Sequence, residues 1–155
     1  MDASRHIVVG VDGSAGSVCA LRWALEQAQL SGATVQAINA WEYPNMYGSY
    51  PLASDIDWRS NAQQILDVAL NAVVGLDTAK VSTTVVEGHP ATVLLEASVG
   101  AELLVVGNRG HGGFVEALLG SVSQHVITHA TCPVVVIRSD TQAEPAPPPA
   151  HPGKA

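Results

Sequence analysis

Glycine and serine residues concentrate in one stretch of the chain, and their spacing suits the binding of a phosphate group. The stretch runs from Leu103 to Ser123, opens with an apolar run and then contains Gly107, Gly110, Gly112, Gly113 and Gly120. Glycine lets backbone N–H groups approach an anion without an intervening side chain. A helix N-terminus, which we expect at the end of the stretch, adds further N–H groups and the positive end of the helix dipole. The stretch therefore predicts a phosphate-binding loop.

The spacing of this loop differs from two common nucleotide-binding motifs. A P-loop needs Gly-x-x-x-x-Gly-Lys-Ser/Thr, and no lysine lies near this loop. A dinucleotide fingerprint would follow the first strand, where Gly10, Gly13 and Gly16 stand in the wrong register. Ser121 is followed three residues later by a glutamine, and this capping-box pattern predicts that Ser121 caps a helix. The hydroxyls of Ser121 and Ser123 would then lie beside a phosphate or a metal ion.

Several titratable side chains could contact a ligand at this loop. Arg109 and His111 lie inside it, where they either pair with outer phosphates or point into solvent, and arginine suits phosphate. Asp12 follows the first predicted strand and either faces the ligand or bonds to its own turn. His125 and His129 have the i, i+4 spacing of zinc ligands, but no third ligand follows. We therefore interpret this pair as a helix face without metal.

Five apolar segments predict strands, and four segments with helical periodicity lie between them. The strands are expected at residues 6–11, 34–41, 81–86, 103–106 and 134–137. The helices are expected at residues 14–32, 54–75, 90–100 and 121–129. This alternation predicts an α/β fold: a doubly wound, five-stranded parallel sheet with helices on both faces and strand order 3-2-1-4-5.

The strand order predicts where a ligand would bind. The first and fourth strands are the most apolar, so both are expected at the centre of the sheet. In the order 3-2-1-4-5 the direction of winding reverses between these two strands. Ligands of such sheets lie at that reversal, beyond the carboxyl ends of the strands. Asp12 and the loop after Gly107 would therefore face each other across one crevice.

Composition narrows the possible classes of protein. The chain has 155 residues, 47% of them hydrophobic, which predicts one domain at residues 1–138, with a disordered proline-rich tail at 139–155. A net charge of -7 argues against binding to nucleic acid, which depends on Lys and Arg. No apolar run reaches the about 20 residues of a membrane span. The first residues also lack the pattern of a signal peptide, so we expect a cytoplasmic protein.

Four parts of the chain resemble the universal stress protein family. They are Val9–Ser14, Gly88–Ala91, the pattern Gly107-x-x-Gly110-x9-Gly120-Ser121, and Cys132–Val136. The resemblance extends over about residues 4 to 138, and the long glycine pattern is the form found in the ATP-binding branch of the family. It implies an ATP site, a role in the stress response and dimers.

The resemblance also implies which residues would hold ATP. Asp12 would contact the ribose or the phosphates, with Gly10 and Val11 beside it. Ala40 would border the adenine, at a position where the family often has a larger aliphatic residue. The glycine loop would supply the remaining contacts, from Val106, Gly107, Arg109, Gly110, His111, Gly112, Gly113, Gly120, Ser121, Val122 and Ser123. A magnesium ion could bridge the phosphates near Asp12 and Ser121.

These residue types favour holding a nucleotide over hydrolysing it. Hydrolysis needs a general base or water-orienting group and charge stabilisation at the γ-phosphate, and the loop has no lysine. We therefore expect an ATP-binding regulatory protein rather than an enzyme. Two alternatives stay open, a slow ATPase and a nucleotide-free dimeric interaction protein. An enzyme of adenylate chemistry would need Ser-Gly-Gly-x-Asp-Ser where this chain has Asp12-Gly13-Ser14-Ala15.

The fifth predicted strand, residues 134–137, indicates a second copy of the chain as a partner. In the predicted order it lies at the edge of the sheet, and all its residues are apolar. An exposed apolar edge strand promotes aggregation. Pairing with the same strand of a second copy, through a two-fold interface, would cover it.

Overall fold

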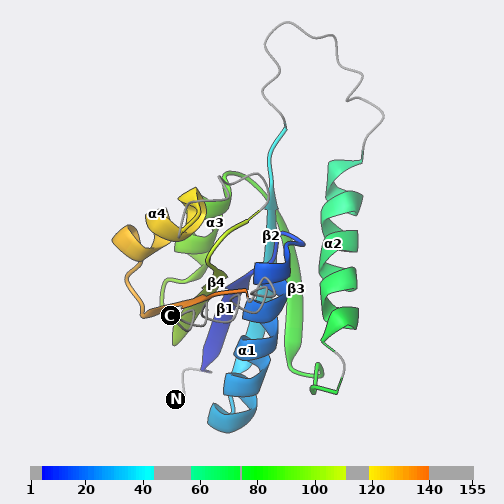
Figure 1. Cartoon of the computed structure of the whole chain (residues 1–155), viewed down its shortest axis with the longest axis vertical. Coiled ribbons are helices and arrows are strands. Elements are labelled where there is room, and N and C mark those ends of the chain that lie inside the picture. Colours follow the sequence, from blue (N-terminus) through cyan, green and yellow to red (C-terminus); the bar gives the residue numbers. More distant parts are fainter. Residues whose placement is uncertain (1–4, 44–56, 74, 111–118, 140–155) are drawn as a thin grey trace, which may run out of the picture.

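Strands and helices alternate along the chain, as the apolar periodicity predicts (Figure 1). The computed structural model describes residues 5–43, 57–73, 75–110 and 119–139. Its elements are β1 (His6–Gly10), α1 (Ala15–Ser31), β2 (Thr34–Trp41), α2 (Trp58–Ala72), β3 (Val81–Glu87), α3 (Pro90–Ala97), β4 (Leu103–Gly107), α4 (Ser121–His129) and β5 (Val134–Ile137). Apart from Ser139, the predicted tail lies outside the described residues.

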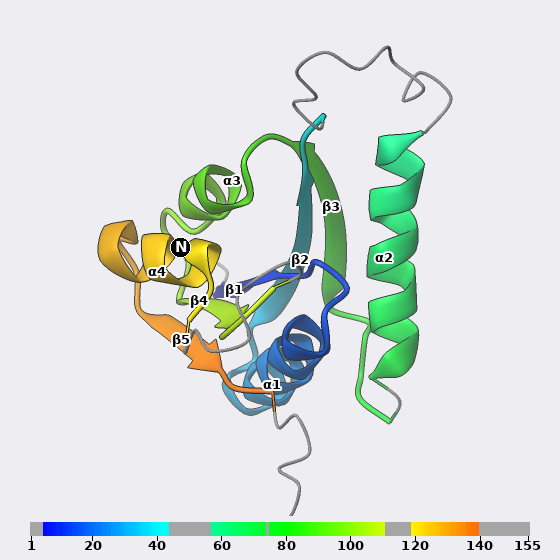
Figure 2. The same cartoon turned by 45° about the horizontal axis from the view of Figure 1, so that its top comes forward.

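The five strands form one parallel sheet in the order β3-β2-β1-β4-β5. Helices α1 and α2 cover one face and α3 and α4 cover the other (Figure 2). The predicted fold class and strand order are therefore confirmed. β1 lies at the centre of the sheet with β4 beside it, and the polar β3 and the short β5 form the two edges.

The central strands fill an apolar layer on each side of the sheet. In β1, Ile7 and Val9 pack in the layer under α1 and α2, whereas Val8 packs in the layer under α3 and α4. A strand that is buried on both faces has a continuous run of apolar residues, and this run is the pattern that predicts β1 from the sequence. Each helix buries only one face, and in the described part of the chain none is long and apolar enough to cross a membrane.

The start of α2 differs from the predicted one. The capping pattern predicts a helix from Ser54, which lies outside the described residues, but Asp57 is the N-cap and α2 begins at Trp58. The Asp57 carboxylate accepts hydrogen bonds from the backbone N–H of Ser60 at 3.0 Å and from its hydroxyl at 2.6 Å. These bonds lower the pKa of Asp57, because they favour its charged form. The acidic residue of the pattern is therefore itself the cap.

The end of β4 packs directly against the first turn of α1. A Cβ atom on Gly107 would lie 2.7 Å from the carbonyl carbon of Gly16 and 3.1 Å from the backbone nitrogen of Ser17. A Cβ atom on Gly16 would in turn lie 3.1 Å from the carbonyl oxygen of Arg109. Only glycine fits Gly107, because the opposing atoms are backbone and cannot rotate away. This contact holds the loop after β4 against the loop after β1.

Gly107→Ala is expected to lower the free energy of unfolding by about 1–3 kcal/mol, because the added methyl group forces two backbone segments apart. Gly120→Ala is the matched control, since its Cβ would meet the Cα of Arg109 at 3.5 Å, an ordinary contact. We expect the control to cost about 1 kcal/mol or less, the loss typical of a weaker helix cap. Urea unfolding of both variants measures the difference, and equal losses would contradict the packing argument.

Candidate functional site

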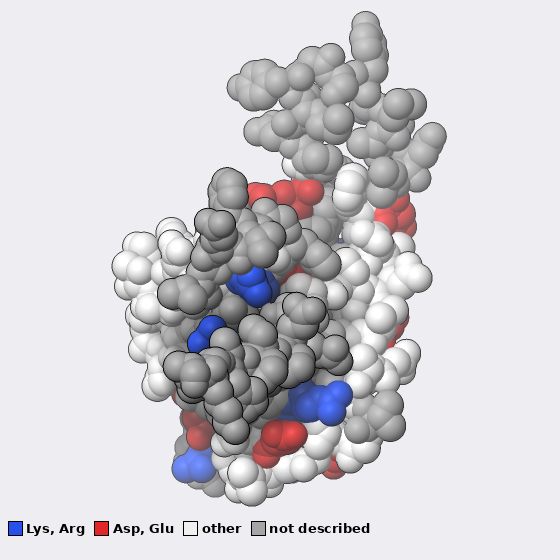
Figure 3. Space-filling model, viewed as in Figure 1, with Lys and Arg blue, Asp and Glu red and all other residues white. Residues whose placement is uncertain are grey.

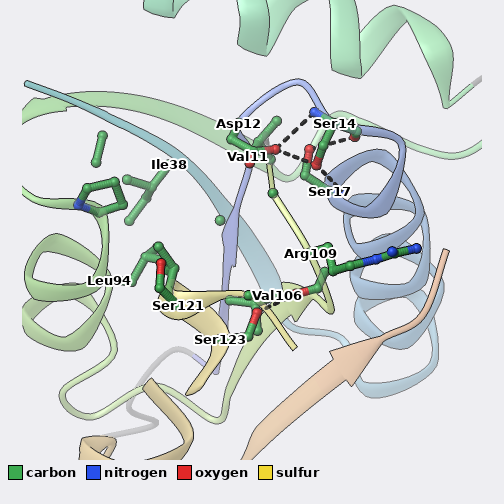
Figure 4. A pocket seen from close by; sticks show the side chains of 17 residues that line it. Val11, Asp12, Ser14, Ser17, Ile38, Leu94, Val106, Arg109, Ser121 and Ser123 are labelled. Atoms are coloured by element: carbon green, nitrogen blue, oxygen red, sulfur yellow. Dashed lines mark hydrogen bonds between the residues drawn. The ribbon is translucent and has the colours of Figure 1, made fainter. Parts of the chain in front are cut away.

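A cavity of about 350 Å³ opens where β1, β2 and β4 end (Figure 4). Ligand pockets commonly measure about 300–1,000 Å³. β1 lies between β2 and β4 in the sheet. Helix α1, which connects β1 to β2, covers one face, whereas α3 and α4, which precede and follow β4, cover the opposite face. The carboxyl ends of the strands diverge there, and this divergence makes the crevice that the strand order predicts.

The predicted site residues that the structure describes all line this cavity. They are Gly10, Val11, Asp12, Ala40, Val106, Gly107, Arg109, Gly110, Gly120, Ser121, Val122 and Ser123. The fold thus brings together segments that lie far apart in the sequence. His111, Gly112 and Gly113 lie outside the described residues. That these residues contact a ligand stays a prediction.

Sequence reasoning missed other residues of the cavity wall, namely Ser14, Ser17, Ile38, Pro90 and Leu94. A signal existed for three of them. Ile38 stands two residues before Ala40, and alternate residues of a strand face the same side. Pro90 lies in a segment that carries the family resemblance. Leu94 follows Pro90 by four residues and so shares its helix face.

Asp12 belongs to a turn and also faces the cavity. Its Oδ1 atom accepts hydrogen bonds from the backbone N–H of Ser14, at 2.9 Å, and from the Ser14 hydroxyl. Ser14 also caps α1, because its Oγ accepts a bond from the Ser17 N–H at 3.2 Å. A Cβ atom on Gly110 would collide with the other oxygen of Asp12, Oδ2. The turn-forming and ligand-facing interpretations of Asp12 are thus compatible.

The N-terminus of α4 reaches the cavity without a side-chain cap. Gly120, not Ser121, is the N-cap, and it makes no side-chain capping bond, so the prediction that Ser121 caps this helix is wrong. The reason is geometric: Gly120 has the extended backbone of an N-cap, and Ser121 is the first helical residue. The backbone N–H groups of Ser121 and Val122 therefore have no partner within the helix. They are donors available to an anion.

The Ser123 hydroxyl holds α4 in place. It donates a hydrogen bond of 2.6 Å to the carbonyl oxygen of Gly107, and Ser123 is 4% exposed. Because the hydroxyl proton is used in this bond, Ser123 can donate to a ligand only through its backbone. The bond also fixes the start of α4 to the end of β4, so the N-terminus of the helix keeps its place beside Gly107.

Arg109 lines the cavity, and its side chain extends away from the other labelled residues (Figure 4). In this arrangement the guanidinium group does not point at the space between Asp12 and Ser121. A contact between Arg109 and outer phosphates would need a different rotamer of the side chain. The cavity is thus lined mainly by backbone and small side chains around the glycine loop.

Apolar side chains line the part of the cavity opposite Asp12. Ile38 and Leu94 lie together there (Figure 4), and they are only 2% and 4% exposed. Pro90 and Ala40 extend this surface. A flat apolar ring can pack against it while an anion meets the N-terminus of α4. The arrangement therefore suits a ligand that carries both a ring and a phosphate.

A buried amide holds the loop that carries Asp12. The Asn39 side chain, which is 6% exposed, donates a hydrogen bond of 2.8 Å from Nδ2 to the carbonyl oxygen of Val11. The N–H of Val11 donates to the carbonyl oxygen of Ile38 at 2.8 Å. Two bonds therefore fasten the backbone before Asp12 to β2, which positions this wall of the cavity.

Metal-ligating side chains and basic side chains are the groups that a metal ion and a nucleic acid would need. Among the described residues there is no group of three or more His, Cys, Asp or Glu side chains that could hold a metal ion. The rings of His125 and His129 stack on each other at 4.3 Å between centroids. On the face in Figure 3, the Lys and Arg side chains of the described residues stand apart and form no continuous basic patch.

The chain is similar to known proteins in both sequence and fold. The model of the universal stress protein family matches residues 3–138 of the chain. A universal stress protein of Mycolicibacterium smegmatis is 32% identical over 144 residues, which are 88% of this chain and 49% of that protein. The chain thus spans about half the length of the curated relatives that it matches.

Solved structures agree with the fold. A universal stress protein in complex with cAMP is 27% identical, with a TM-score of 0.66 over 87% of this chain and 97% of the other. A protein of the family from Arabidopsis thaliana, solved with AMP bound, is 22% identical, with a TM-score of 0.62 over 92% of this chain and 96% of the other. At this lower identity the likeness shows the shared fold alone.

Proposed function

The chain belongs to the universal stress protein family, and we propose that its domain, residues 1–138, binds an adenine nucleotide such as ATP and acts as a nucleotide-responsive regulatory module. One observation carries this proposal. The uncapped N-terminus of α4 opens into the same cavity as the apolar surface of Ile38 and Leu94. A phosphate and a purine ring joined by a ribose match these two surfaces.

In the proposed complex, the phosphates lie at the first turn of α4, where Ser121 and Val122 donate from their backbone N–H groups. Asp12 lies toward the ribose and the phosphates. The adenine packs between Ile38 and Leu94, near Ala40. The similar protein that was solved in complex with cAMP supports an adenine nucleotide as the class of ligand.

We propose that a magnesium ion accompanies ATP in this site. The Asp12 side chain is exposed at the cavity, and its Oδ2 atom lies against Gly110, next to the proposed phosphates. A carboxylate this close to a triphosphate repels it unless a cation lies between them. Mg²⁺ is commonly held by one or two carboxylates together with substrate phosphates, and Asp12 with ATP would supply such a set.

We propose little or no hydrolysis of the nucleotide. None of the described residues that line the cavity is a lysine or a histidine, and the Arg109 side chain extends away from it. Phosphoryl transfer needs an oriented water and groups that stabilise the charge of the transition state. A slow ATPase is the alternative, and the observation that favours it is the Oδ2 atom of Asp12, which faces the glycine loop.

Ser121→Pro tests the phosphate contact, with Ser121→Ala as the matched control. Proline is favourable at the first helical position, and Gly120 already has the extended backbone (φ -74, ψ 167) that a residue before proline adopts. Both variants lose the hydroxyl, but only proline loses the N–H group. Hydrogen bonds to charged groups contribute about 1.5–3 kcal/mol, so proline should bind ATP about tenfold more weakly than alanine. Calorimetric titration with ATP measures both, and equal affinities would contradict the predicted contact.

Turnover of ATP is expected to be negligible in the presence of Mg²⁺. The assay measures phosphate release by the unsubstituted protein and by Asp12→Asn, which keeps the shape of the turn but removes the charge. Sustained turnover of about 1 per second, the low end of typical enzymes, would overturn the regulatory proposal. In that case the loss of this activity in Asp12→Asn would identify Asp12 as a catalytic group.

We also propose a homodimer through β5. This strand lies at the edge of the sheet, and its four residues are all apolar and half-buried. The carbonyl oxygens of Pro133 and Ile137 accept bonds from the N–H groups of Leu104 in β4 and of Asn108 just after it, at 3.0 Å and 2.9 Å. Because strand residues alternate, the N–H and C=O groups of Val134 and Val136 point to the outer edge. A second copy can pair with these groups.

Val136→Pro is expected to make the protein monomeric. Proline removes the outward N–H group of β5 but leaves the bonds to β4, which come from alternate residues. Val136→Ala is the control, because it shortens the side chain and keeps the N–H group. Sedimentation velocity at micromolar concentration should show dimers for the unsubstituted protein and for the control. A monomeric unsubstituted protein would contradict the proposed dimer.

A further inference from the structure

Asn108 connects the start of α4 with the end of β5. Its carbonyl oxygen accepts a hydrogen bond of 2.6 Å from the N–H of Gly120, the N-cap of α4. Its own N–H donates to the carbonyl oxygen of Ile137 at 2.9 Å, and its side-chain Oδ1 accepts from the N–H of Ser139 at 3.3 Å. Asn108 is 5% exposed. One buried residue thus holds both the proposed phosphate site and the edge strand.

We propose that Asn108 is a positioning residue that couples occupancy of the phosphate site to the order of β5. This inference rests on the proposed function, because it takes the first turn of α4 as the place where phosphate binds. Binding of phosphate there would fix Gly120 against Asn108, and Asn108 would then fix the last residues of β5. Asn108 has no place among the predicted ligand contacts, so its role is separate from theirs.

β5 is the element whose end can open and close. Within one copy of the chain, β5 has only four residues and pairs on one side with β4. Short edge segments open locally at a lower cost in free energy than the core of a sheet. The bonds of Asn108 to Ile137 and Ser139 close the end of this strand. A ligand that binds only while α4 is in place therefore favours the closed end of β5.

The reverse effect follows from thermodynamic linkage. If nucleotide binding favours the closed end of β5, then loosening that end must weaken nucleotide binding by the same factor. A purely structural Asn108 would behave differently. Loosening the end of β5 would then lower stability, but it would leave nucleotide affinity unchanged. The two roles can therefore be separated by a substitution outside the cavity.

Ser139→Pro is the substitution that separates them, with Ser139→Ala as the matched control. Ser139 does not line the cavity and lies beyond the last residue of β5. Proline removes the N–H group that donates to Asn108 Oδ1, whereas alanine keeps it. Neither change alters Asn108 or a residue of the apolar core, so both variants should fold.

Amide hydrogen exchange of Val134–Ile137, followed by mass spectrometry with and without saturating ATP, gives the first readout. In the unsubstituted protein and in Ser139→Ala, ATP should slow this exchange by about fivefold or more. In Ser139→Pro the slowing should fall below about twofold, and calorimetry should show a matching loss of ATP affinity. Without ATP, exchange at Ser121–Ser123 should also be faster in Ser139→Pro than in Ser139→Ala.

Asn39→Ala controls for loosening of the cavity wall at a place that is not connected to β5. It removes a buried side-chain bond to Val11 on the other side of the cavity, but it has no bond to β5. Whatever its ATP affinity, ATP should still slow exchange in β5 of this variant. Equal ATP affinity and equal slowing in Ser139→Pro and Ser139→Ala would overturn the coupling while leaving nucleotide binding intact. Failure of the unsubstituted protein to bind ATP would instead overturn the proposed function and the coupling with it.

Discussion

The cavity depends on a contact between two stretches of backbone, at Gly107 in β4 and at Gly16–Ser17 in α1. A Cβ atom on Gly107 would lie 2.7 Å from the carbonyl carbon of Gly16, so the end of β4 and the first turn of α1 can meet only because Gly107 has no side chain. This contact closes one side of the crevice between β1 and β4. It also brings the first turn of α1 close to the loop that leads to α4. The glycine of the motif therefore serves packing first, and access of an anion follows from it.

The parallel sheet places positive potential at the cavity of a chain whose net charge is -7. After each parallel strand the chain crosses back through a helix, so every such helix begins at the carboxyl edge of the sheet. Residues at the starts of α1, α3 and α4 accordingly line one cavity. Their dipoles and N–H groups supply positive potential without lysine or arginine side chains. Of these helices only α4, in the part of the chain that the structure describes, lacks a side-chain cap.

Much of the fold and of the cavity could be predicted from the sequence, because both depend on local patterns. The apolar runs of β1 and β4 identified the central strands, and the glycine spacing identified the loop between β4 and α4. The sequence pattern places the N-cap of α4 at Ser121 instead of Gly120, because glycine and serine are both frequent at N-caps. The side-chain direction of Arg109 and the bonds of Asn108 to Ile137 and Ser139 depend on tertiary packing, and no local pattern encodes them.

The type of hydrogen-bond donor in the cavity bears on the difference between holding ATP and hydrolysing it. In the proposed complex, the backbone N–H groups at the first turn of α4 would contact charge that the phosphates already carry in the ground state. Interactions that are equally strong in the ground state and the transition state tighten binding without accelerating the reaction. A catalyst would need a group aimed at the charge that develops during transfer, such as the guanidinium of Arg109, and this group points away from the cavity. The first turn of α4, where we propose that phosphate binds, is also joined through Asn108 to the edge of the sheet. This connection is the proposed route by which occupancy of the site reaches β5.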